Sequence, residues 1–171
     1  AFCGCLSLSK IVIPASVTSI GDGAFSDCRS LSNIDIPDSV TCIGDCVFSH
    51  CRSLSNIAIP ASVTSIGDKS FYNCSSLKYI SIPESVICLN GNPFSHWIGK
   101  LECLSPNFIY EDDILFDKNK SKIISFRNQS LEAYVIPASV TSIGDSAFCG
   151  CLSLSKIVIP ASVTSIGDGA F

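Results

Sequence analysis

The chain has little charge and few of the residues that carry most enzyme chemistry. Only 15% of its 171 residues are charged, and it has two histidines, one tryptophan and no methionine. No apolar run reaches the roughly 18 residues that a membrane-spanning helix needs, so we expect no membrane insertion. The formal net charge is −4, and lysine and arginine occur singly except around residues 118–122. Without a basic patch for a phosphate backbone, we expect no nucleic-acid partner.

The sequence is rich instead in apolar residues, at 47%, and in a repeat of 23 residues. One unit reads A-F-x-x-C-x-S-L-x-x-I-x-I-P-x-S-V-T-x-I-G-D. The phenylalanine column contains Phe2, Phe25, Phe48, Phe71, Phe94, Phe148 and Phe171. Because a single unit cannot bury enough apolar surface to fold alone, the repeat predicts a solenoid of stacked coils with parallel, in-register strands.

Each unit predicts two short extended segments and a turn. In the second unit, residues 31–36 alternate and end at Pro37, which cannot donate to a strand ladder. Residues 40–43 are β-branched and apolar, which favours a second short strand. Gly44 belongs to a column of glycines, which predicts a positive φ at this position. Asp45 follows in a column of aspartates, and we expect these to cap a short helical turn that carries the phenylalanine.

The repeated string resembles the BspA-type leucine-rich repeat, found in surface proteins of mucosal bacteria and some parasitic protists. The resemblance covers residues 1–92 and 130–171. It implies a right-handed, curved, β-rich solenoid with parallel strands on the concave side and short turns or 3-10 helices on the convex side. It also implies a non-enzymatic, cell-surface or secreted adhesion scaffold that binds a protein partner. A host extracellular-matrix protein is one candidate.

The expected organisation is a single leucine-rich-repeat domain over residues 1–171, with regular repeats at 1–94 and 130–171. Residues 95–129 form an irregular module, in which two apolar runs around a polar turn predict a β-hairpin over 114–126. The register of residues 101–104 is ambiguous. Residues 147–171 repeat residues 1–25 without a change, at an offset of 146. We therefore expect a fragment of a longer protein whose open terminal coils associate weakly end to end.

The eleven cysteines predict no metal site. Their odd number argues against complete pairing, and parallel strands hold side chains farther apart than a disulfide requires. We interpret the main column as a ladder of free thiols; it contains Cys5, Cys28, Cys51, Cys74 and Cys151. The two histidines and Cys3 do not complete a four-ligand zinc site. Asp117-x-Asn119-x-Ser121 lacks the later glycine and glutamate of a calcium loop, so we expect no metal and no cofactor.

Catalysis is not expected either. A nucleophile needs a base within hydrogen-bond reach, and neither His50 nor His96 stands beside a unique serine or cysteine motif. The three acidic residues at 111–113 are interpreted as solvated loop carboxylates. The chain is therefore expected not to be an enzyme.

Two columns flanking the inward isoleucines vary while their neighbours stay constant. This pattern favours a binding surface, although a surface that merely tolerates substitution gives the same pattern. Tyr79 is the best single anchor, because exposed aromatic residues dominate binding hot spots. The candidates are Lys10, Val12, Asn33, Asp35, Asn56, Ala58, Tyr79, Ser81, Lys156 and Val158. The leading hypothesis is an adhesion scaffold. The alternatives are a structural or self-assembling extracellular spacer with no specific ligand and, more remotely, an intracellular scaffold.

Overall fold

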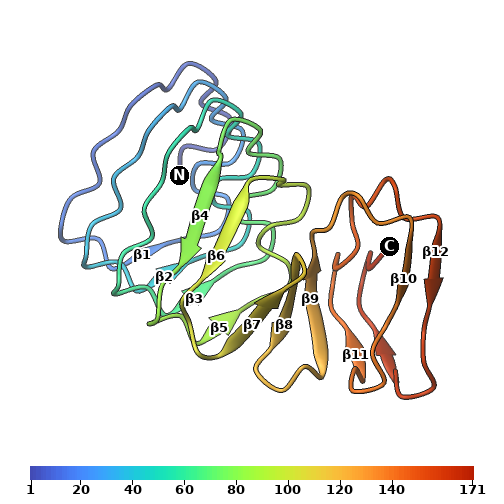
Figure 1. The fold of residues 1–171 in the computed structure, drawn as a ribbon. Coiled ribbons are helices and arrows are strands. Elements are labelled where there is room, and N and C mark those ends of the chain that lie inside the picture. The colour runs from blue at the N-terminus through green and yellow to red at the C-terminus, as the bar shows by residue number, and fades with distance from the viewer. The chain divides into compact units, whose positions relative to one another are not determined.

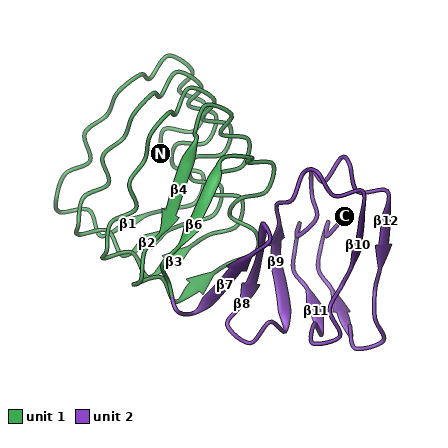
Figure 2. Ribbon diagram, in the orientation of Figure 1, with its two compact units in different colours: residues 1–105 green, residues 106–171 purple.

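The computed structural model describes residues 1–171, which form thirteen short β-strands and no helix (Figure 1). The contacts divide the chain into two compact units, residues 1–105 and residues 106–171 (Figure 2). The boundary falls inside the predicted irregular module, and the single domain over residues 1–171 stays a prediction. Unit 1 contains β1 (Ser19–Ile20), β2 (Cys42–Ile43), β3 (Ser65–Ile66), β4 (Tyr79–Ile82), β5 (Cys88–Leu89) and β6 (Lys100–Cys103). Unit 2 contains β7 (Phe108–Glu111), β8 (Ile114–Asp117), β9 (Lys122–Phe126), β10 (Ala133–Val135), β11 (Ser142–Ile143), β12 (Lys156–Val158) and β13 (Ser165–Ile166).

Unit 1 is a stack of coils in which each strand pairs with the same strand of the next repeat. A parallel sheet runs in the order β1-β2-β3-β5, and its register places Ile20 beside Ile43 and Ile43 beside Ile66. On another side of each coil, β4 and β6 also pair in parallel. Figure 1 shows these two sets of strands along the successive coils. The predicted solenoid with parallel, in-register strands is confirmed.

The phenylalanine column forms the core of unit 1. Phe25, Phe48, Phe71 and Phe94 are buried, and each ring stacks on the ring of the next coil. The distances between successive ring centroids lie between 5.8 and 6.0 Å. Stacked aromatic rings add to the hydrophobic energy of burial, so this column binds each coil to the next.

The turn after the core phenylalanine is hydrogen-bonded but not helical. In each turn the cysteine backbone N–H donates to the phenylalanine carbonyl three residues earlier, as Cys51 does to Phe48 at 3.1 Å. The expected 3-10 helices are therefore wrong, because each turn ends after one such bond and the chain extends again. All eleven cysteines are free thiols. The Cys74 Sγ donates to the Phe48 carbonyl of the preceding coil at 3.0 Å, and burial raises the pKa of this thiol to about 12.

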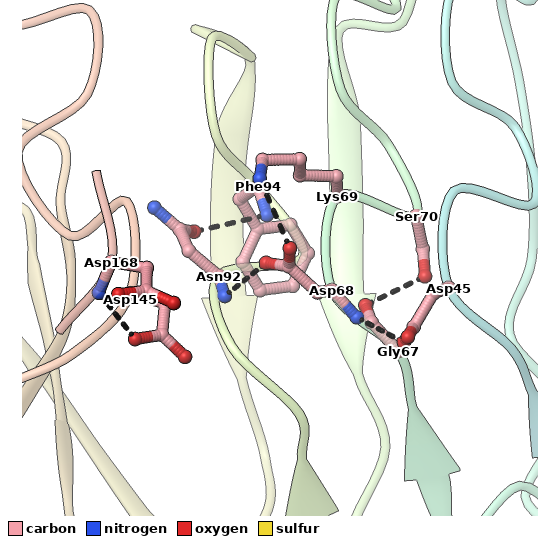
Figure 3. A network of polar contacts seen from close by, with 9 residues as sticks. All are labelled: Asp45, Gly67, Asp68, Lys69, Ser70, Asn92, Phe94, Asp145 and Asp168. Carbon is pink, nitrogen blue, oxygen red and sulfur yellow. Dashed lines mark hydrogen bonds and ion pairs between the residues drawn. The ribbon is translucent and has the colours of Figure 1, made fainter. Parts of the chain in front are cut away.

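The aspartate column does not cap the turn of its own repeat, which corrects the prediction from the sequence. Instead, each carboxylate accepts a backbone N–H from the next coil. Asp45 Oδ1 accepts the N–H of Asp68 at 2.8 Å, and Asp68 Oδ1 accepts the N–H of Asn92 at the same distance (Figure 3). In unit 2, Asp145 accepts the N–H of Asp168 in the same way. The column is thus a polar ladder that joins successive coils.

The glycine column also differs from the prediction. None of its glycines has a positive φ, which occurs two residues later at positions such as Cys46 and Lys69. The glycines are required by close approach. A Cβ on Gly67 would lie within 3.0 Å of the backbone of Gly44 and Asp45 in the neighbouring coil. Glycine is needed here because only a residue without a side chain lets the coils stack this closely.

Unit 2 contains the predicted β-hairpin. Strands β8 and β9 pair antiparallel, and β7 extends the hairpin to three antiparallel strands. The backbone N–H groups of Ser121 and Lys122 donate to Asp117 Oδ1 at 2.7 Å, so this aspartate closes the turn. Strand β9 then pairs in parallel with β11, with Ile123 beside Ile143. The hairpin therefore supplies a strand on which the regular repeats resume.

Candidate functional site

The outward columns of unit 1 form two rows along the coils, which we call the strand surface. The first row contains Lys10, Asn33, Asn56, Tyr79 and Lys100, and the second contains Val12, Asp35, Ala58, Ser81 and Glu102. Bridges between coils join Asn33 to Asn56, Val12 to Asp35, and Ser81 to Glu102. All of these residues are exposed except Ser81, which is half-buried. The strand surface therefore brings together eight of the ten candidates named from the sequence.

A polar cluster lies on the strand surface where β4 meets β6. The Tyr79 hydroxyl donates to Glu102 Oε2 in a short hydrogen bond, and the Ser81 hydroxyl donates to the same oxygen at 3.2 Å. Tyr79 remains 43% exposed. The glutamate thus holds the tyrosine in one position while its ring stays open to solvent.

The electrostatics of this cluster favour an ionised glutamate and a neutral tyrosine. The hydrogen bond from Tyr79, followed by that from Ser81, lowers the pKa of Glu102. The same hydrogen bond to Glu102 raises the pKa of Tyr79. The cluster therefore presents a neutral phenol beside a fixed negative charge across the neutral pH range.

Analysis of the sequence did not find Lys100 and Glu102, because the register of their segment was ambiguous. In the structure, β6 pairs with β4 at an offset of 21 residues, with Tyr79 beside Lys100. Within β6, Lys100 and Glu102 are exposed while Leu101 is buried. This alternation was the available signal, and the shortened repeat concealed it.

The last two candidates, Lys156 and Val158, lie in unit 2. They belong to β12, which pairs in parallel with β10 so that Val158 lies beside Val135. Both valines are largely exposed, at 44% and 67% respectively. This pair of strands therefore presents an apolar surface to solvent.

The remaining chemical groups do not assemble into a catalytic or metal centre. No group of three or more His, Cys, Asp or Glu residues is arranged to hold a metal ion. His50 and His96 flank the ring of Tyr72 on successive turns, and His50 Nδ1 lies 3.1 Å from the side-chain nitrogen of Asn73. No helix in the structure is long and apolar enough to cross a membrane. The geometry of the exposed rows suits recognition by contact.

Comparison with known families decides the classification of this architecture. The profile described as BspA type leucine rich repeat region matches six copies, over residues 1–110 and 122–171. The chain belongs to the BspA-type leucine-rich repeat family. The resemblance seen in the repeat is therefore confirmed, and the match also includes part of the irregular module. Among curated proteins, none matches.

Solved structures of bacterial leucine-rich repeat proteins share the fold of this BspA-type chain. A leucine-rich repeat protein from Eubacterium ventriosum is 33% identical with a TM-score of 0.82, covering 99% of this chain and 46% of that protein. A leucine-rich cell surface protein from Faecalibacterium prausnitzii is 32% identical with a TM-score of 0.72, covering 100% of this chain and 54% of that protein. The pneumococcal vaccine antigen PcpA is 25% identical with a TM-score of 0.75, covering 95% and 48%. The chain thus spans about half the length of these proteins.

Proposed function

We propose that this BspA-type chain is a non-enzymatic binding scaffold on the cell surface or in secreted form, and that it recognises a protein partner through its strand surface. The observation that carries the proposal is the cluster of Tyr79, Ser81 and Glu102. Exposed tyrosines supply large contact areas at interfaces, and a side chain that is already fixed loses less entropy on binding. The description of one similar protein as a cell surface protein supports the location.

The composition of the strand surface suits a folded protein partner better than a small molecule. Its two rows extend over five coils, and they mix apolar, amide and charged side chains. Such a mixture is typical of interfaces between proteins, in which a few anchors carry most of the affinity. An extracellular-matrix protein of a host is the partner class that we propose.

The experiment that tests this function is a binding assay against immobilised collagen, fibronectin and laminin. We expect saturable binding to at least one of them, and a loss of at least about tenfold in affinity for Tyr79→Ala, as for a hot-spot residue. Arg52→Ala is the matched control, because Arg52 is exposed on a turn outside the strand surface. Binding that both variants retain would contradict the proposal, and the absence of binding would favour the spacer alternative.

A further inference from the structure

Unit 2 contains a cavity of about 440 Å³ that the proposed function does not use. The cavity lies between the loop after β7 and the segment that includes β10. Its apolar lining includes Ile114, Phe116 and Leu131. Glu111 and Asp112 contribute two carboxylates, and Tyr134 contributes a half-buried aromatic ring. The cavity therefore combines an apolar wall with acidic groups.

The charge of this lining is negative and incompletely balanced. No lysine, arginine or histidine is among the lining residues. Glu111 pairs with Lys120 at 2.6 Å, whereas Asp112 forms no ion pair. Burial first, and then the charges of Glu111 and Asp112, raise the pKa of Tyr134. The tyrosine thus responds to a negative potential inside the cavity.

A group that fits such a lining has an apolar stem and a positively charged head. Lysine and arginine side chains have this structure, since their methylene stems pack on apolar surface while the head stays polar. A guanidinium or ammonium group also interacts favourably with a tyrosine ring. We propose that this cavity binds a lysine or arginine side chain of a partner polypeptide.

The surroundings of the cavity favour a polypeptide over a free amine. Val135 lines the cavity and also belongs to β10, where it lies beside Val158 of β12. Because both valines are exposed, apolar surface continues from the cavity onto the neighbouring strands. This surface has room for the residues that flank a bound basic side chain.

The probe for this site is the peptide Ac-Ala-Arg-Ala-NH₂, titrated into the full chain and followed by amide chemical shifts. We expect saturable shifts at Asp112, Leu131 and Tyr134. The matched peptide carries citrulline, which keeps the shape of arginine and removes its charge. We expect it to bind about fivefold more weakly, as the loss of one ion pair predicts.

Two neighbouring variants provide a control within the protein. Asp112 and Asp113 are both exposed and have left-handed φ angles of 50° and 59°, a conformation that asparagine tolerates. Asp113 does not line the cavity, and its Oδ1 accepts the Tyr110 hydroxyl at 2.9 Å. We expect Asp112→Asn to weaken binding of the arginine peptide about three- to fivefold, and Asp113→Asn to change it less than about twofold.

Three results would overturn the proposal. The first is the absence of saturable shifts at the cavity, and the second is equal affinity for the arginine and citrulline peptides. The third is an equal loss of affinity in Asp112→Asn and Asp113→Asn. None of these results depends on the strand surface of unit 1, so this test and the test of the proposed function can fail separately.

Discussion

At the scale of single residues, the constant positions of the repeat serve contacts between coils. The glycine before each aspartate recurs because the neighbouring backbone leaves no room for a Cβ. The aspartate recurs because its carboxylate accepts an N–H from the next coil. From the sequence, both residues also fit a local turn, because a repeat shows that a position is constant but not which neighbour constrains it. The columns were therefore identified correctly and their causes were not.

The glycine column gives a prediction with a control from the same column. A Cβ on Gly67 would lie within 3.0 Å of backbone atoms, whereas a Cβ on Gly21 would meet nothing within 4 Å. We expect Gly67→Ala to lower the free energy of unfolding by at least about 2 kcal/mol, because backbone must shift to admit the methyl group. Gly21→Ala should change it by less than about 1 kcal/mol.

Urea unfolding followed by tryptophan fluorescence measures both glycine variants. Trp97 is the single tryptophan, is buried, and donates to the Leu77 carbonyl at 2.7 Å, so it reports on unit 1. Equal losses for the two variants would show that close approach is not the reason for the glycine.

At the scale of elements, the repeat period determines most of what the structure shows. A step of 23 residues places equivalent strands side by side and predicts their parallel register, from β1 to β5. The hairpin of β8 and β9 was also predictable, because two apolar runs enclose a polar turn. The position of β6 was not predictable, since its partner β4 lies 21 residues earlier instead of 23. Where the period fails, the sequence no longer indicates which residues are neighbours.

The stacked phenylalanines carry the prediction that belongs to this scale. Phe48 is fully buried between Phe25 and Phe71, so Phe48→Ala should cost about 3 to 5 kcal/mol of stability in urea unfolding. Phe2 occupies the same column but is 40% exposed and contacts only Phe25 among the rings. Phe2→Ala should therefore cost less than about 1.5 kcal/mol. A loss below 1 kcal/mol for Phe48→Ala would contradict the stacked core.

At the scale of the whole molecule, each unit combines a constant core with a variable exterior. The sequence predicted the exposed rows because variation on one face of a constant repeat is visible without a structure. It did not predict the Tyr79 cluster, because the cluster requires Glu102 from the irregular module. The cavity of unit 2 was also not predictable, since its lining comes from segments on both sides of the hairpin. The features most specific to this chain thus arise where the repeat is interrupted.

The central claim is that unit 1 binds its partner through the strand surface, and footprinting of the complex tests it most directly. The chain would be labelled with hydroxyl radicals, alone and bound to the matrix protein that it binds most tightly, and analysed by mass spectrometry. The account predicts that binding protects Tyr79 and its neighbours in β4 and β6, while Arg52 on the turn stays equally reactive. Protection confined to the turns, with Tyr79 unchanged, would contradict the account.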